Sequence, residues 1–386
     1  MIYLSMFAIS SFFIYIFEKT EKTNKVYSKI FLILGLSLPI LLAALRDETV
    51  GIDISTYVKP LYNCALRSEN FSAFLSMIKM NIKTREVETG FCILVYISTI
   101  VFKSLNGVML LCEFFIIIPL YLALINIKKY MYQYHSDIYI NYIWISMFCY
   151  YAFFYNNSLN QIRQAIACSF TLLFFSLAIL RKYKVAIVTL LIASSMHFSA
   201  FVVIFIYVLF YLISKEKNKI HWFISIGIIF ASAFLSQIFE WILKIGYTIK
   251  IIPEKYYGQI FIVKYNDIDY NFLWIIICIF MVITSVMINI KYKNIAIFQE
   301  WQIISLLALC MMPVCGIYAN FGRIVLYLLI YSVVIIPLVY TVTVHKIVQA
   351  RLFSDCLIVI FGIAYWIVSI GLYDYTGTLV YKFVWS

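Results

Sequence analysis

The sequence is poor in charged residues. Only 12% of its 386 residues are Asp, Glu, Lys or Arg, and 64% are hydrophobic. A soluble globular domain is about 25% charged and about 45–50% apolar. The shortage of charge therefore excludes an ordinary soluble domain. It predicts an all-α polytopic membrane protein in which residues 1–386 form a single integral membrane domain.

Several familiar site patterns are also absent. The sequence has no Walker loop and no Gly-x-Ser-x-Gly nucleophile elbow. Its nine cysteines include no Cys-x-x-Cys pair. Most of them lie inside apolar segments, as is typical of cysteines that pack as small buried hydrophobes. We therefore predict no metal site and no cofactor.

Positive charge is in excess, since 30 Lys and Arg residues outnumber 18 Asp and Glu residues. The basic residues form six clusters in short loops between apolar segments, near 19–29, 128–129, 181–184, 215–219, 291–293 and 346–351. Such clusters are typical of the cytoplasmic loops of membrane proteins and do not resemble a groove that follows nucleic-acid phosphates. We expect no nucleic-acid partner.

About twelve apolar segments are candidates for transmembrane helices: 2–17, 30–45, 105–126, 138–155, 159–180, 185–196, 198–213, 222–243, 271–290, 301–319, 323–344 and 352–373. A spanning helix needs roughly 20 residues, or fewer where the membrane thins. With all six basic loops in the cytoplasm, both termini lie outside and the chain crosses twelve times. This scheme requires two short helices that turn near His197. It leaves 90–102 as a re-entrant or partly inserted segment.

The same scheme creates two long outer loops, 46–89 and 244–270. The first contains a stretch whose apolar residues repeat at i, i+3, i+4 and i+7, namely Phe71, Phe74, Leu75 and Ile78. This spacing predicts an amphipathic helix that lies in the outer membrane interface.

The most polar stretch of the chain is 46–57, directly after the second apolar segment. It contains four ionisable residues and one glycine. Gly51 permits a positive φ and a tight reversal, which we expect to fold Asp53 back towards Arg46. The alternative is a solvated turn with a surface ion pair. We treat Asp47 and Glu48 as surface residues in either case.

A second polar stretch opens the segment that follows residue 156. Asn160, Arg163, Gln164 and Ala167 are spaced as on one face of a helix. An arginine in the outer turn of a membrane helix needs a partner, either a carboxylate such as Asp53 or a ligand phosphate. The alternative is an interfacial arginine that reaches the lipid headgroups.

Three further polar residues stand out. His197 follows an apolar segment, and its imidazole would accept a proton from a sugar hydroxyl or orient it. The alternative is a histidine that is hydrogen-bonded within the packing. Arg323 opens a later helix on the predicted outer side. Glu113 lies well within a helix, where it pairs with an arginine or points into a cavity.

Together these features predict an outward-facing cavity that contains Arg46, Asp53, Arg163, His197 and Arg323. We expect Arg46 and Asp53 to lie close to Arg163. The set fits a metal-free reaction of a lipid diphosphate, in which the arginines stabilise the leaving group. His197 or Asp53 would assist the attacking hydroxyl.

The motifs that carry this site resemble those of the EpsG family of Wzy-like polysaccharide polymerases. They are Arg46-Asp-x-x-Val-Gly-x-Asp-x-x-x-Tyr57, Arg163-Gln164, His197-Phe-Ser-Ala200 and Tyr318-x-Asn-Phe-Gly-Arg323. Each motif is weak alone, but the set occurs in order over nearly the whole chain. The resemblance implies an all-helical, C-type membrane glycosyltransferase with no required metal.

The resemblance also implies a reaction and its residues. The growing chain would be transferred from its lipid diphosphate to the non-reducing end of an undecaprenyl-diphosphate-linked repeat unit, at the outer face of the bacterial cytoplasmic membrane. Asp53, Arg163 and His197 would be catalytic. The substrate-binding residues would be Arg46, Tyr57, Asn160, Gln164 and Arg323. A flippase and a chain-length regulator are candidate partners, and the product is O-antigen, capsule or exopolysaccharide.

Two other functions are compatible with parts of the sequence. A flippase for lipid-linked oligosaccharides, or another transporter, would carry charge at mid-depth and Gly- or Pro-broken helices in paired positions. The six prolines show no such pairing. An O-antigen ligase would have a larger late outer loop than 244–270.

Overall fold

The computed structural model describes residues 1–81, 84, 86–134, 143–215, 223–228, 268–292, 295–317, 322–339, 348–374 and 376–385, with isolated positions between 234 and 250. These residues form helices, and their only β pairing is an isolated antiparallel bridge between Arg46 and Phe383. The predicted all-α class is therefore confirmed for the part of the chain that is described. Much of segment 222–243 and most of loop 244–270 lie outside it.

The helices follow the chain in the order α1 (Ile2–Thr20), α2 (Lys25–Ala44), α3 (Lys59–Arg67), α4 (Phe71–Met80), α5 (Thr89–Phe102), α6 (Leu105–Tyr134), α7 (Ile143–Tyr150), α8 (Asn156–Asn160), α9 (Ile162–Ile179), α10 (Tyr183–Met196), α11 (Val203–Lys215), α15 (Ile268–Lys291), α16 (Ala296–Ile317), α17 (Gly322–Leu329), α18 (Ser332–Ile335) and α20 (Val348–Trp366). Two π-helical turns, Ile54–Val58 and Tyr151–Tyr155, precede α3 and α8. Such turns are rare and are often found at functional sites.

Seven helices in the described residues are long and apolar enough to cross a membrane: α1, α2, α6, α9, α15, α16 and α20. The predicted count of twelve spans is not confirmed. The helices α5 and α10 are apolar but have only 14 residues each. The predicted break near His197 is present, because α10 ends at Met196 and a 3-10 turn, Phe198–Val202, precedes α11.

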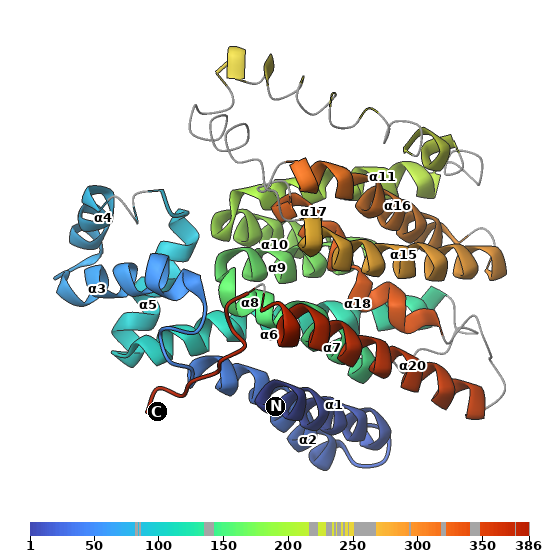
Figure 1. Cartoon of the computed structure of the whole chain (residues 1–386), viewed down its shortest axis with the longest axis horizontal. Helices are drawn as coiled ribbons and strands as arrows, with labels where there is room; N and C mark the ends of the chain where they lie inside the picture. The colour runs from blue at the N-terminus through green and yellow to red at the C-terminus, as the bar shows by residue number, and fades with distance from the viewer. Residues whose placement is uncertain are drawn as a thin grey trace. The chain divides into compact units, whose positions relative to one another are not determined.

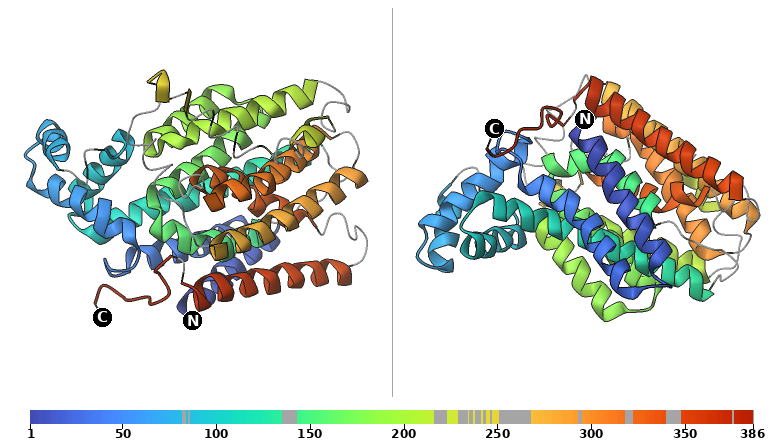
Figure 2. Two further views of the ribbon diagram at one scale, coloured as in Figure 1. Left: turned by 45° about the horizontal axis from the view of Figure 1, so that its top comes forward. Right: turned by 90° about the horizontal axis from the view of Figure 1, so that it is seen from below.

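The chain divides into two compact units. The first contains Met1–Phe201 and Asp355–Ser386, and the second contains Val202–Ser354. In the first unit α6 packs against α9, α9 against α10, and α1 against both α2 and α7 (Figure 1). The helix α9 is the most deeply buried of the seven candidate spans. Figure 2 shows α1 and α2 side by side as an antiparallel pair.

In the second unit, α15 and α16 form a helical hairpin, since a short connection separates them and they pack along one another. The helix α16 also packs against α11 and α17. A buried hydrogen bond of 2.6 Å joins the Asn289 amide to the Gln302 side chain across the hairpin. This bond stabilises the hairpin, because each amide would otherwise be buried in apolar surroundings without a partner.

The helix α4 has the predicted amphipathic spacing, but its apolar face packs on the protein. Phe74 and Ile78 are buried, and the ring centroid of Phe74 lies 5.0 Å from that of Tyr96 in α5. Phe71 contacts the same tyrosine at 5.1 Å. Part of the apolar face therefore packs on α5, while Phe71 stays exposed, and the location of α4 in the membrane interface stays a prediction.

Candidate functional site

The turn at Gly51 places loop 46–57 against the end of α8. Gly51 has a φ of +95°, as its position in the loop predicted. A Cβ at this position would lie 2.6 Å from the carbonyl oxygen of Leu159. The next residue, Ile52, donates its backbone N–H to the Asn160 side-chain oxygen at 2.9 Å. Glycine is required here both for its conformation and for the close approach of two backbones.

A break at Gln161 separates α8 from α9, and Asp53 binds at this break. Gln161 has φ −114° and ψ 60°, which are not helical values. The first backbone N–H groups of a helix have no partner within the helix. Asp53 meets this need, because its Oδ2 accepts the backbone N–H of Ile162 at 3.1 Å. A carboxylate is also favoured there by the positive end of the helix dipole.

This break corrects one prediction from the sequence. We expected Asn160, Arg163 and Gln164 to share one face of a continuous helix. Instead, Asn160 ends α8 and binds loop 46–57, whereas Arg163 and Gln164 lie in the first turn of α9. Gln164 is buried and Arg163 is only partly buried. The helical period does not continue across Gln161, because the loop binds on both sides of it, Ile52 to Asn160 and Asp53 to Ile162.

Arg163 lies between a carboxylate and an aromatic ring. Its Nη1 forms an ion pair of 2.6 Å with Oε2 of Glu88, and its guanidinium carbon lies 4.2 Å from the ring centroid of Tyr57. The side chains of Arg163 and Glu88 are 12% and 20% exposed. A cation stacked on a ring and paired with a carboxylate in this setting has a defined orientation. The ion-pair partner is thus Glu88, where the sequence had suggested Asp53.

The same carboxylate reaches the turn that follows α10. Oε1 of Glu88 accepts the backbone N–H of Phe198 at 3.4 Å. In that turn the hydroxyl of Ser199 lies 2.6 Å from Nδ1 of His197. Because α9 and α10 are consecutive and antiparallel, the start of α9 and the end of α10 lie at the same end of the pair. Arg163 and the His197 turn are therefore connected through one glutamate.

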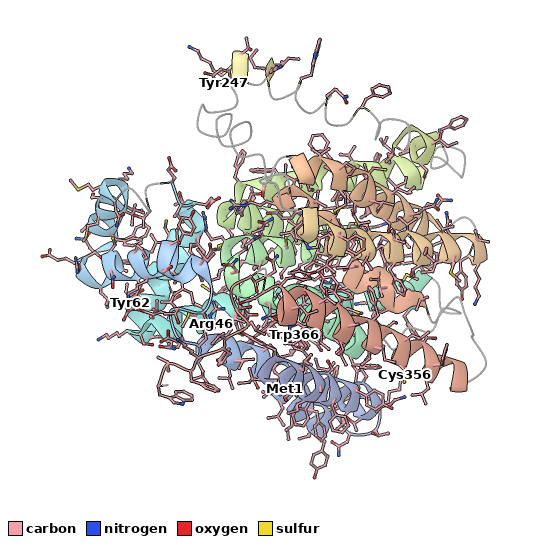
Figure 3. All side chains as sticks on the ribbon, in the orientation of Figure 1. Met1, Arg46, Tyr62, Tyr247, Cys356 and Trp366 are labelled. Carbon is pink, nitrogen blue, oxygen red and sulfur yellow. The ribbon has the colours of Figure 1, made fainter. Side chains whose placement is uncertain are left out.

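Arg46 lies in a different environment. It is 2% exposed, and its backbone pairs with Phe383 near the C-terminus. Figure 3 labels Arg46 on the ribbon. Asp47 donates its N–H to the carbonyl oxygen of Lys382 at 2.8 Å, which extends this pairing. Burial lowers the pKa of Arg46, and the nearby Glu113 opposes this shift. Nε and Nη1 of Arg46 have no hydrogen-bond partner within the described part of the chain.

The sequence predicted that Arg46 and Asp53 both lie close to Arg163. Asp53 contacts the residue that precedes Arg163, as expected. The electrostatic neighbours of Arg46 include Glu113, Tyr155 and Tyr3. The expected proximity is therefore found for Asp53, and that of Arg46 stays a prediction. Glu113 lies near Arg46, which agrees with one of the two alternatives that the sequence left open, but the two form no ion pair within 4 Å.

Arg323 is an exposed residue in the first turn of α17, in the second unit. Its contribution to the site therefore stays a prediction.

Glu88 is the residue that sequence reasoning missed. Loop 46–89 contains several acids, and nothing in their spacing distinguishes one of them. The available signal was the position of Glu88 directly before the apolar segment at 90–102, where a carboxylate is favoured by the helix that begins there. In the structure Glu88 precedes the first residue of α5.

No three His, Cys, Asp or Glu side chains among the described residues gather closely enough to hold a metal ion. The charge balance of the cluster is more informative. Asp53 and Glu88 carry two negative charges, whereas Arg163 carries one positive charge. An anionic ligand that binds Arg163 must therefore compete with Glu88.

Long apolar helices and a polar cluster at the ends of α9 and α10 define a polytopic helical membrane protein with a candidate site at helix termini. The chain belongs to the EpsG family, whose model matches residues 29–383. EpsG is a family of Wzy-like polymerases, and the match includes every site residue named above. No curated protein and no solved structure matches the chain.

The turn at Gly51 leads to a first prediction. Replacing Gly51 with alanine should lower the free energy of unfolding by about 2–4 kcal/mol, because the new Cβ adds a clash to an unfavourable φ. Gly377 is a matched control, since its φ is +63° and a Cβ there would meet no atom within 4 Å. Gly377→Ala should cost only about 1–2 kcal/mol. Thermal unfolding of the purified variants measures both, and equal midpoints would contradict the close packing at Leu159.

A second prediction concerns Asp53. Asparagine keeps an oxygen that accepts the N–H of Ile162, so Asp53→Asn should change the free energy of unfolding by less than about 0.5 kcal/mol. Asp53→Ala leaves this N–H without its partner and should cost about 1 kcal/mol. The same unfolding measurement distinguishes them. An asparagine variant as unstable as the alanine variant would show that Asp53 does not act as the helix cap.

Proposed function

We propose that this protein is a polysaccharide polymerase of the bacterial cytoplasmic membrane. It transfers a glycan chain from its lipid diphosphate to the non-reducing end of a repeat unit carried on undecaprenyl diphosphate, at the outer face. Membership of the EpsG family supports the general role. The observation that supports the site is the connection of Arg163, through Glu88, to the His197 turn at one end of the α9–α10 pair.

Arg163 is the residue that binds the diphosphate. A guanidinium matches the geometry of phosphate oxygens with paired, charge-assisted hydrogen bonds. The ring of Tyr57 supports one face of the guanidinium at 4.2 Å and thereby limits its movement. As the bond between the anomeric carbon and the diphosphate oxygen breaks, negative charge grows on the leaving group. A fixed positive charge stabilises that change.

His197 is the residue that accepts the proton. The acceptor hydroxyl attacks the anomeric carbon, and its proton passes to the imidazole as the diphosphate leaves. Ser199 holds Nδ1 at 2.6 Å and orients the ring. Asp53 is the less suitable base, because its carboxylate already accepts the N–H of Ile162. We therefore assign Asp53 to the positioning of Arg163.

The remaining predicted residues have supporting roles in this proposal. Asn160 holds the Gly51 turn through the N–H of Ile52, and Gln164 supports the first turn of α9 from its buried position. Arg46 anchors the loop beneath the C-terminal residues, a role supported by its burial. Arg323 would add a further positive charge for the diphosphate or the glycan. A flippase and a chain-length regulator are the expected partners.

The direct test uses the purified protein in lipid nanodiscs with a lipid-linked repeat unit. The wild type should convert it into a ladder of longer glycans. Arg163→Ala and His197→Ala should each reduce the rate by about 10²-fold or more, because each removes a group that acts in the transition state. Arg67→Ala is the matched control, since Arg67 is an exposed arginine at the end of α3. A flippase would move the lipid without lengthening its glycan, and that result would contradict the proposal.

Metal independence is tested separately in the same assay. The chain contains Asp267-Ile268-Asp269, a carboxylate pair of a kind that suits magnesium or manganese, in a region that is mostly outside the described residues. We expect EDTA to leave the rate unchanged. Loss of the ladder with EDTA and its return with added Mg²⁺ or Mn²⁺ would contradict a metal-free reaction.

A further inference from the structure

Glu88 connects two parts of the site, Arg163 and the turn that follows α10. Its Oε2 lies 2.6 Å from Nη1 of Arg163, and its Oε1 accepts the N–H of Phe198, the residue after His197. One oxygen of this carboxylate thus binds Arg163, the proposed diphosphate-binding residue. The other binds the turn that carries His197, the proposed proton acceptor.

The location of this carboxylate depends on the close packing of α5 on α10. Gly90 lies in the first turn of α5, directly against Ser195 near the end of α10. A Cβ at residue 90 would lie 2.7 Å from the Ser195 carbonyl oxygen and in contact with the Ser195 side chain. The absence of a side chain at Gly90 therefore brings Glu88 within reach of Phe198.

A diphosphate and Glu88 would compete for the same guanidinium. In the structure, Glu88 occupies Nη1 of Arg163, and Nε of Arg163 has no hydrogen-bond partner among the described residues. Phosphate oxygens bind a guanidinium in the same paired manner as a carboxylate. A bound diphosphate would therefore weaken the contact at Oε2. The other oxygen would then be able to bind Phe198 more closely than the present 3.4 Å.

We propose that Glu88 is a positioning residue that couples occupation of Arg163 to the conformation of the His197 turn. When a diphosphate group replaces Glu88 on Arg163, the carboxylate moves towards Phe198 and orders the turn that carries the imidazole. The site then becomes competent for proton transfer only when its anionic substrate is bound. This inference deepens the proposed polymerase function and rests on it.

An exposed ion pair elsewhere in the same loop provides a matched control. Lys59 and Glu48 also lie 2.6 Å apart, but their side chains are each 43% exposed. Exposed ion pairs contribute little, because water and salt screen them. Glu48→Gln therefore changes a charge in the same loop and should leave both kinetic constants as in the wild type.

The kinetic test uses Glu88→Gln and Glu88→Asp. Glutamine has the same length as glutamate but no negative charge, so it forms no ion pair with Arg163. Its KM for the lipid-linked donor should fall about fivefold, because the competing carboxylate is gone. Its kcat should fall about tenfold or more, because the His197 turn is no longer set by the substrate. Aspartate keeps the charge but is one methylene too short to reach both partners, so kcat should fall while KM does not.

A residue that only stabilised the fold would lower the yield of folded protein and leave KM and kcat of the folded fraction unchanged. Suppose that the wild type polymerises and that KM and kcat of Glu88→Gln are both within twofold of its values. This result would overturn the inference and leave the proposed function intact.

A second measurement does not depend on turnover. Hydrogen exchange at the amide of Phe198 is followed with and without inorganic pyrophosphate. Pyrophosphate should slow this exchange in the wild type and in Glu48→Gln, but not in Glu88→Gln. An equal response in the wild type and Glu88→Gln, or no response in either, would overturn the coupling. If pyrophosphate slows the exchange in the wild type but the wild type makes no glycan, the result would contradict the proposed function and not the coupling.

Discussion

The hydrogen bond from the Ile162 N–H to Asp53 is the interaction on which the candidate site depends. It joins a loop at residue 53 to the first turn of a helix 109 residues later in the chain. Because α9 begins at this bond, the bond also determines where Arg163 lies. Gly51 and Asn160 support the same junction, one through the absence of a side chain and the other through the N–H of Ile52. A break in a membrane helix is tolerated where such side chains satisfy the freed backbone groups.

The second determinant is electrostatic. A partly buried arginine with a single close carboxylate is held in place, and removing the carboxylate would leave a charge that is poorly compensated. In this structure the pair also connects α5 to α9 and, through Phe198, to the end of α10. The site is therefore built from helix ends and loops at one end of the packed helix pair formed by α9 and α10. Arg46 and Glu113 form a separate buried environment near the C-terminal residues, where neither side chain is within ion-pair distance of the other.

Much of the fold could be predicted from composition and local pattern. The lack of charge identified a helical membrane protein, the basic loops required a break near His197, and Gly51 indicated the positive φ that the structure has. These features depend on residues close together in the sequence. The number of membrane spans was not confirmed. Length and hydropathy alone do not decide whether a short apolar helix such as α5, with 14 residues, crosses the membrane.

The parts of the site that could not be predicted depend on distant residues. The neighbours of the break at Gln161, namely Leu159, Asn160 and Ile162, contact residues 51–53. Helical spacing alone could not include these distant contacts and suggested a continuous face. Arg46 and Arg163 each lie at the end of an apolar segment in sequence, but Arg46 is buried and its backbone pairs with Phe383. In the sequence Glu88 is one acid among several, and only the packing of α5 on α10 distinguishes it. A pattern of residue types predicts which chemistry is available, whereas the long-range contacts determine which side chains meet.

The central claim is that Arg163 binds the diphosphate of a lipid-linked substrate and releases Glu88 when it does so. The most direct measurement is an experimental structure of the protein in nanodiscs with an undecaprenyl-diphosphate-linked repeat unit. Our account predicts that the diphosphate lies within hydrogen-bond distance of the Arg163 guanidinium and that Glu88 has moved towards Phe198. A diphosphate bound away from Arg163, with the ion pair to Glu88 intact, would contradict it.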